Sequence, residues 1–239
     1  MAEPGRTLVG FDFAFGYPIE AGLPVGRALC ARFAGMIRDE PDGANNRFEV
    51  AGLLNREIQG ARAEAHDGPF WGHPGGRGYP HLAPKRPRPF PPHIPNGRMA
   101  ERRHGARGIQ SPWKLYTVGA VGSQTLVGLP AVHRLLVDPA LAGRTRLWPF
   151  ETAWDRAIDR DSIVIAEMWP SLVDCRGQHY RIKDARQVAA LRDWALDEPA
   201  ALARGLARPA GLTDAEERVA RESEGWIVEP SVSARGRGR

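Results

Sequence analysis

The stretch "SIVIAEMWP", residues 162–170, places the strongest constraint on the fold of this chain. Its apolar run is almost continuous and is broken only near its end, by Glu167. Such a run is typical of a strand covered on both faces, as in parallel sheets flanked by helices. The run from Thr7 to Phe13 and the stretch "TRLWPFE" are further strand candidates. Because helical patterns separate these strands, the sequence predicts an α/β fold.

Helical patterns occupy much of the remaining chain. Leu29, Phe33 and Ile37 recur four residues apart in a helix predicted over residues 23–37. The other predicted helices are residues 46–65 capped by Asn46, "QTLVGLPAVHRLL" capped by Ser123, "KDARQVAALRDWAL", and one that opens with a capping box at Thr213 and Glu216.

A long segment rich in proline and glycine interrupts this pattern between about residues 66 and 110. Proline and glycine at this density disfavour helices and strands, so we predict an irregular insertion. Its aromatic residues indicate that parts of it dock onto the core: Phe70, Trp71, Tyr79 and Phe90. We therefore predict one domain over residues 1–230 with this insertion, and a disordered basic tail over residues 231–239.

Positive charge is concentrated in part of this insertion. The formal net charge of the chain is +5, yet the segment from Lys85 to Arg107 alone has seven basic residues and one acid, Glu101. Localised positive charge suits a nucleic-acid phosphate backbone, although a solvated loop can have the same composition. The candidate phosphate contacts are Lys85, Arg86, Arg88, Arg102, Arg103 and Arg107.

A second candidate for phosphate binding is the start of the helix near Ser123. The backbone N–H groups of Ser123 and Gln124 can face a phosphate there, with a plain N-cap as the alternative. The stretch "GAVGSQTLVG" has no Gly-Lys-Ser/Thr ending, which excludes a P-loop, and no Gly-x-Ser-x-Gly nucleophile elbow. The histidines match no strong zinc-ligand spacing.

The composition also bears on the cellular compartment. Cys30 and Cys175 are too few for a disulfide framework. No run approaches the roughly 18 apolar residues of a membrane span, and "MAEPGRT" lacks the apolar stretch of a secretory signal. We expect a cytoplasmic protein with no membrane contact.

Two acids lie at or near the ends of predicted strands. Asp12 and Glu167 each follow an apolar run, and each precedes a turn with proline, in "DFAFGYP" and "EMWP". The carboxyl edge of strands in an open α/β sheet is where ligands bind. The alternative for each acid is structural, since a carboxylate can cap the next helix or accept backbone N–H groups in the turn.

A third acid, Asp184, lies in the first turn of the predicted helix after the second of these strands. An acid there is favoured by the helix dipole and alone means little. Together, Asp12, Glu167 and Asp184 would suit Mg²⁺ or Mn²⁺, because these cations take oxygen ligands. Such ions can activate water and stabilise the leaving oxygen in phosphodiester hydrolysis. We predict these three acids as catalytic metal ligands.

The stretches "LVGFDFAFGYP", "GSQTLVGLP", "VIAEMWPSLV", "KDARQV" and "EGWIV" resemble an uncharacterised bacterial family of the ribonuclease H-like superfamily, which is predicted to be nuclease-like. The resemblance implies a mixed sheet flanked by helices. It also makes Asp12 the fourth-strand acid, Glu167 a later strand acid and Asp184 the helix acid. Similar sequences have a label linking them to molybdopterin-guanine dinucleotide synthesis, which no residue pattern here supports.

The resemblance also implies that something is missing. The ribonuclease H-like fold begins with a three-stranded antiparallel meander, and only six residues precede Thr7. We therefore expect the N-terminal meander to be absent, and the strand of Asp12 to lie at an open edge that a second copy could cover as a homo-oligomer. The expected function is divalent-metal-dependent phosphodiester hydrolysis of nucleic acid, and the missing meander leaves open whether this truncated form is active. The alternatives are a non-catalytic nucleotide or nucleic-acid binding module and an accessory protein in molybdopterin cofactor biosynthesis.

Overall fold

The computed structural model describes residues 5–60, 68–105 and 109–230 of the chain. Its sheet has four strands: β1 (Thr7–Phe11), β2 (Thr145–Leu147), β3 (Ile163–Met168) and β4 (Ile227–Val228). β3 lies at the centre, with β1 on one side and with β2 and β4 on the other. These pairings are all parallel, so the described sheet is parallel where a mixed sheet was expected.

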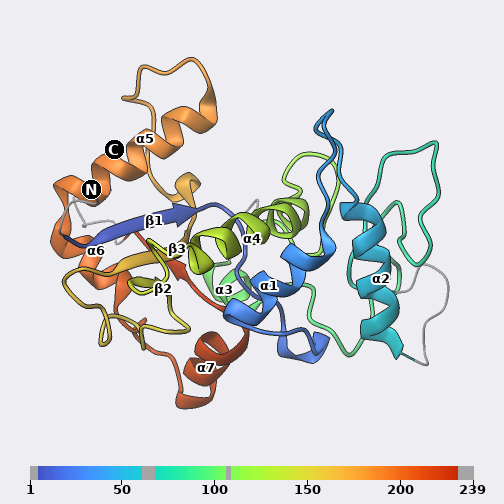
Figure 1. The fold of residues 1–239 in the computed structure, drawn as a ribbon, viewed down its shortest axis with the longest axis horizontal. Coiled ribbons are helices and arrows are strands. Elements are labelled where there is room, and N and C mark those ends of the chain that lie inside the picture. The colour runs from blue at the N-terminus through green and yellow to red at the C-terminus, as the bar shows by residue number, and fades with distance from the viewer. Residues whose placement is uncertain (1–4, 61–67, 106–108, 231–239) are drawn as a thin grey trace.

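Helices cover both faces of this sheet (Figure 1). On one face, Val9, Phe11 and Ile165 pack into a core with α1 (Gly26–Met36) and α4 (Val121–Val137). On the other face, alternate residues of β3 join a second core with α5 (Lys183–Asp197) and α6 (Pro199–Leu206): Val164, Ala166 and Met168. The α/β architecture predicted from the unbroken apolar run of β3 is thus confirmed.

Three further helices complete the described fold: α2 (Arg47–Gln59), α3 (Met99–His104) and α7 (Asp214–Val219). Single turns of other helix types lie at Ile19–Ala21, Pro170–Leu172 and Ala220–Glu224. None of the described helices is long and apolar enough to cross a membrane.

The insertion docks onto the core through its aromatic residues, as predicted. Phe70 and Tyr79 are buried, while Trp71 and Phe90 are half-buried against the first core. Phe70 meets Trp113 edge-on with ring centroids 4.9 Å apart. The prediction of an irregular segment was wrong for α3, which lies inside the insertion; at its start the carboxylate of Glu101 accepts from the backbone N–H and from the guanidinium of Arg98.

Two of the predicted helix caps differ from the structure. α4 begins at Val121, and the hydroxyl of Ser123 donates to the carbonyl of Leu115. Asn46 precedes α2, but its side chain bonds backbone groups of Arg38 and Met36 and does not cap the helix. The capping box of Thr213 and Glu216 at the start of α7 is confirmed.

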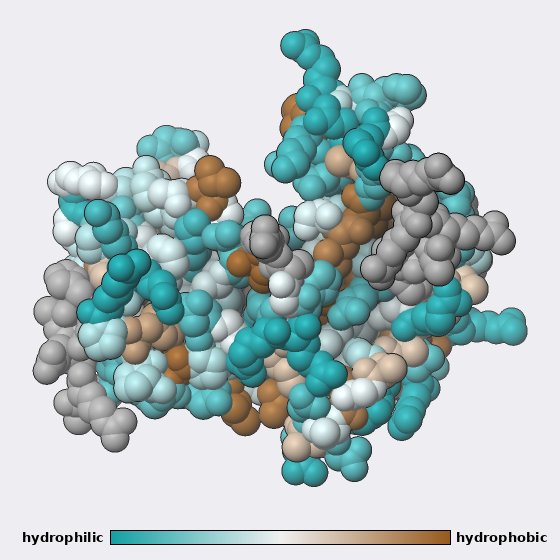
Figure 2. All heavy atoms as spheres, turned by 180° about the vertical axis from the view of Figure 1, so that it is seen from behind, coloured by the Kyte–Doolittle hydropathy of each residue, from teal (hydrophilic) through white to brown (hydrophobic). Residues whose placement is uncertain are grey.

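The edge formed by β1 is open within the described strands, because β1 pairs only with β3. Near it, α5 leaves Val188 and Leu196 exposed. Seen from behind, the molecule shows a hydrophobic band at the foot of its projecting part, whereas hydrophilic side chains cover much of the surface around it (Figure 2).

Candidate functional site

The carboxyl ends of β1 and β3 bring Asp12 and Glu167 to the same edge of the sheet. In the register of the two strands, however, Glu167 is the partner of Phe11. Partners in register share a face, and successive residues of a strand point to opposite faces. Asp12, one residue after Phe11, therefore leaves the strand toward the face covered by α5, and Glu167 points to the other face.

Asp12 lies near Asp184, the second residue of α5. Shielding from water by the surrounding protein, and to a smaller extent the negative charge of Asp184, together raise the pKa of Asp12 from 3.8 to about 6. Both residues keep an exposed outer side. Within the described residues, neither carboxylate forms an ion pair, so their mutual repulsion is not relieved by the protein.

Glu167 is only 1% exposed and has a cation of its own. The guanidinium of Arg98, which is completely buried, donates from its two terminal nitrogens to the two carboxylate oxygens of Glu167, each at 2.7 Å. The indole N–H of Trp169 donates to the same carboxylate at 2.9 Å. Both oxygens of Glu167 are therefore occupied by protein donors.

Arg98 joins Glu167 to two other parts of the chain. Its Nε donates to Glu101 Oε1 at 2.9 Å, and its Nη1 donates to the backbone carbonyl of Glu224 at 3.1 Å. The Glu224 side chain, also buried, accepts from the backbone N–H of Met99. We call Arg98, Glu101, Glu167 and Glu224 the Arg98 cluster.

The charges of the Arg98 cluster depend on one another. Burial disfavours the charge of Arg98, but Glu101 and Glu167 outweigh this effect and raise its pKa above the ordinary value. Burial likewise raises the pKa of Glu167 and of Glu224, against the attraction of Arg98. The cluster is therefore stable only as a unit, because any one member left alone would be an unpaired charge in the core.

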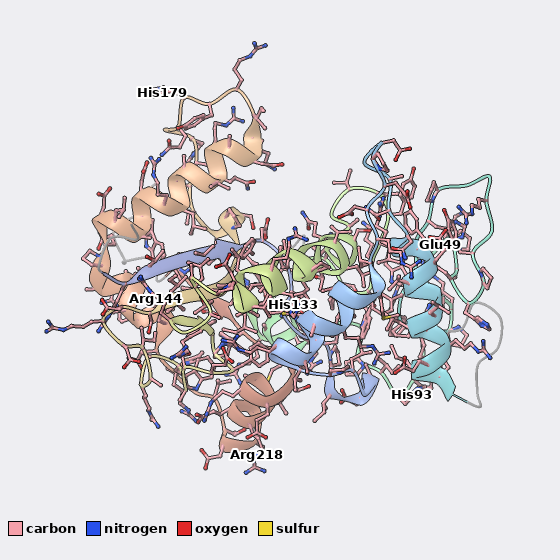
Figure 3. The ribbon with its side chains drawn as sticks, in the orientation of Figure 1. Glu49, His93, His133, Arg144, His179 and Arg218 are labelled. Atoms are coloured by element: carbon pink, nitrogen blue, oxygen red, sulfur yellow. The ribbon has the colours of Figure 1, made fainter. Side chains whose placement is uncertain are left out.

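The structure places two of the three predicted metal ligands within electrostatic range of each other and separates the third. The charge of Asp184 acts on Asp12 at the α5 side, whereas Glu167 is held by Arg98. Among the described residues, no group of three or more His, Cys, Asp or Glu side chains could hold a metal ion. Figure 3 shows His93, His133 and His179 well apart, on three different parts of the chain.

The predicted basic contacts have varied environments. Lys85, Arg86 and Arg88 are exposed, and Arg86 lies over the ring of Phe90, 5.2 Å from its centroid. On α3, Arg102 donates to the carbonyl of Gly97, and Arg103 pairs with Glu216 at 2.8 Å. Arg107 and the predicted tail lie outside the described residues.

The start of α4 is already hydrogen-bonded within the chain. The N–H of Gly122 donates to the Lys114 carbonyl, and those of Ser123 and Gln124 donate to the Ala120 carbonyl. Ser123 and Gln124 do line a surface pocket beside Arg47 and Asn45. A phosphate there would meet their side chains, because their N–H groups are occupied.

Arg98 is the important residue that the sequence does not reveal. Its partner Glu167 lies 69 residues further along the chain. Arg98 belongs to a segment in which seven basic residues look alike, and the only local signal is Glu101 three residues later. That spacing can indicate a contact across one helical turn.

No family model matches the chain, and no curated protein or solved structure matches it either. Arguments about function therefore rest on the residues and their geometry.

Proposed function

We propose that this protein is a divalent-metal-dependent phosphodiesterase that acts on nucleic acid, with Asp12 and Asp184 as its metal ligands. The observation that carries the proposal is the placement of Asp12 at the carboxyl edge of a parallel sheet, without a described ion pair and close enough to Asp184 for that charge to help raise the pKa of Asp12 to about 6. A bound cation would offset their repulsion and favour the ionised form of Asp12.

The donor set fits Mg²⁺ or Mn²⁺. These ions bind carboxylate oxygens and commonly keep several waters, so two carboxylates are enough to anchor one of them. Asp12 and Asp184 would hold the ion, and the ion would supply charge stabilisation for the phosphate and lower the pKa of bound water. Glu167 takes a different role from the predicted one, since it anchors Arg98 and Trp169.

The arrangement of the sheet supports a ribonuclease H-like fold as part of this proposal. β1 and β3 are parallel neighbours, and an acid follows β1 while another begins the helix after β3. The outer edge of β1 has no partner among the described strands, which is where the resemblance expects another strand. Pairing of that edge by a second copy stays a prediction that the mass in solution tests.

The exposed basic residues of the insertion would contact the phosphate backbone. Lys85, Arg86 and Arg88 have solvent-facing charges, and each contact to phosphate releases counterions. Binding should therefore weaken as salt rises. A non-catalytic binding module is the second candidate. It is favoured by the pairing of Glu167 with Arg98, because only two of the three predicted carboxylates then stay available to hold a metal ion. Binding that is unaffected by EDTA would favour this second candidate.

The test compares three single substitutions. Asp12→Asn and Asp184→Asn should each abolish Mn²⁺ binding by calorimetry and reduce Mn²⁺-dependent cleavage of single- and double-stranded oligonucleotides by a factor of at least about 100. Asp197→Asn is the matched control, because Asp197 is an exposed acid at the other end of α5. Equal binding and cleavage by Asp12→Asn and Asp197→Asn would overturn the proposal.

A further inference from the structure

A second candidate site lies on the other side of β3 from Asp12. β4 and β1 flank β3 on opposite sides at Glu167. Around β4 lies a pocket of about 660 Å³, lined by residues of α3, of the end of α6 and of the turn that follows it. A pocket of this size is large enough for a small organic ligand. We call it the β4 pocket. The charged and aromatic residues of its lining are Arg103, His104, Arg204, Arg208, Trp226 and Glu229.

Three guanidinium groups and the carboxylate of Glu229 line the β4 pocket, but carboxylates just outside the lining neutralise two of these guanidinium groups. Two of the arginines are fixed by neighbours. Arg103 donates to Glu216 at 2.8 Å and to the Gly211 carbonyl at 3.2 Å. Arg208 donates to Glu217 and to the Leu212 carbonyl, each at 2.6 Å. A guanidinium has five N–H groups, so each keeps donors for a ligand.

Arg204 differs from the other two arginines. Within the described residues its side chain has no ion pair and no hydrogen bond, and it lies at the end of α6 on the pocket wall. An unpaired guanidinium beside two oriented ones is an arrangement suited to an anion with several oxygens. Arginine matches phosphate particularly well, because its planar fork can donate two parallel hydrogen bonds.

Two ring nitrogens of the wall also lack partners. Trp226 is only 3% exposed, and its indole N–H has no hydrogen bond in the described structure. The Nδ1 of His104 is buried and likewise has no partner there. Buried polar groups are nearly always hydrogen-bonded. Both nitrogens are closed off from the pocket by neighbouring atoms, so they are not ligand contacts in this conformation.

The pocket also offers apolar surface. Trp226 and Ile227 lie on one side and Ala207 and Pro209 on another. An inorganic phosphate ion would fill a small part of this volume and would leave the aromatic and apolar walls without contact. A phosphate ester with a ring or chain would use both kinds of surface.

We propose that the β4 pocket binds an organic phosphate of nucleotide size, with Arg204, Arg103 and Arg208 on the phosphate and Trp226 beside the organic part. The proposal does not depend on metal chemistry at Asp12, because the pocket contains no residue of that site. The edge-on contact of His104 with Trp169, 5.5 Å between ring centroids, places the pocket wall next to the indole that donates to Glu167.

The test measures binding of AMP to the full chain by calorimetry in EDTA, with adenosine, inorganic phosphate and succinate as comparison ligands. We expect AMP to bind and the other three to bind at least about tenfold more weakly, since each lacks either the phosphate or the organic part. Arg204→Gln should weaken AMP binding about tenfold. Arg134→Gln is the matched control, because it removes one exposed arginine from α4, on the opposite face of the sheet, and should leave AMP binding unchanged.

Trp226→Leu keeps an apolar side chain and removes the aromatic ring beside the organic part of the ligand, and it should weaken AMP binding of the folded variant several-fold. Asp12→Asn should bind AMP as the parent does, which separates this proposal from the metal site. The proposal is overturned if AMP does not bind to folded protein in EDTA, if Arg204→Gln and Arg134→Gln bind it equally, or if succinate binds as tightly as AMP.

Discussion

Asp12 and Glu167 have the same sequence setting and opposite environments. Each comes at the end of an apolar strand, and each is followed by a turn with proline. Asp12 is exposed on one side and feels the negative charge of another acid, Asp184, whereas Glu167 is buried and binds an arginine. The register of β1 with β3 creates this difference, because it places Phe11, and not Asp12, opposite Glu167.

The comparison shows what an acid at a strand end does and does not imply. The pattern predicts the edge of the sheet correctly, since both acids lie there. It does not say which face the side chain takes or whether the protein supplies the counter-charge. For Glu167 the counter-charge comes from Arg98 in the insertion, so this acid stabilises the fold. For Asp12 no described residue supplies it, and the cation that we propose would do so.

The largest expected effect comes from removing the cation of the buried pair. Arg98→Met should lower the free energy of unfolding by about 3–5 kcal/mol, because it leaves Glu167 as an unpaired charge in the core. The measurement is urea unfolding followed by tryptophan fluorescence and far-ultraviolet circular dichroism. Arg88→Met is the control, because Arg88 is an exposed arginine of the same segment and should change stability by less than about 0.5 kcal/mol. Similar stability of the two variants would show that the Arg98 cluster does not stabilise the fold.

A smaller effect should follow from neutralising Glu167 while keeping its shape. In Glu167→Gln, the amide oxygen can still accept one hydrogen bond from Arg98. The amide N–H₂, however, faces the second N–H donor of Arg98. We therefore expect the free energy of unfolding to fall by about 2 kcal/mol. Mn²⁺ affinity should stay as in the parent, because Asp12 and Asp184 are unchanged. If Glu167 were a metal ligand, the variant would instead lose Mn²⁺ affinity, and calorimetry of the folded variant distinguishes the two roles.

Local patterns were sufficient to predict the elements that depend on neighbouring residues. The apolar run of β3, the amphipathic α5 and the capping box of α7 are each set by spacing along the chain, and each is found in the structure. Docking of the insertion through Phe70 and Tyr79 follows from the tendency of large aromatic side chains to be buried.

The parts that could not be predicted depend on residues far apart in the sequence. Arg98 reaches Glu167 only because an insertion without periodicity folds back over the sheet edge, and no local pattern specifies that path. The separation of Asp12 from Glu167 depends on the pairing of strands more than 150 residues apart. The occupied N–H groups at the start of α4 depend likewise on the preceding loop, which supplies the Lys114 carbonyl.

The smallest effect concerns the pH dependence of stability at Asp12. Burial and the charge of Asp184 raise the pKa of this carboxyl to about 6 in the folded protein, above its ordinary value of 3.8. At pH values below about 4, both folded and unfolded chains hold the proton, so the group has no effect on stability. Between about pH 4 and pH 6 the folded chain keeps a proton that the unfolded chain has released, and stability falls as pH rises. Above about pH 6 both forms are ionised and the full loss persists.

Asp12→Asn removes this contribution, so the difference in free energy of unfolding between variant and parent should grow by about 1 kcal/mol from pH 4 to pH 7, in favour of the variant. We expect this modest value because water screens a carboxylate that is exposed on one side. Urea unfolding of both proteins at several pH values measures the difference, in which the titration of all other groups cancels. Saturating Mn²⁺ should reverse the order at pH 7, because a bound cation stabilises the ionised form of Asp12 in the parent alone. If the difference in free energy of unfolding between variant and parent does not change with pH, the pKa of Asp12 is that of a free carboxylate. Asp12 and Glu167 would then differ only in how deeply they are buried.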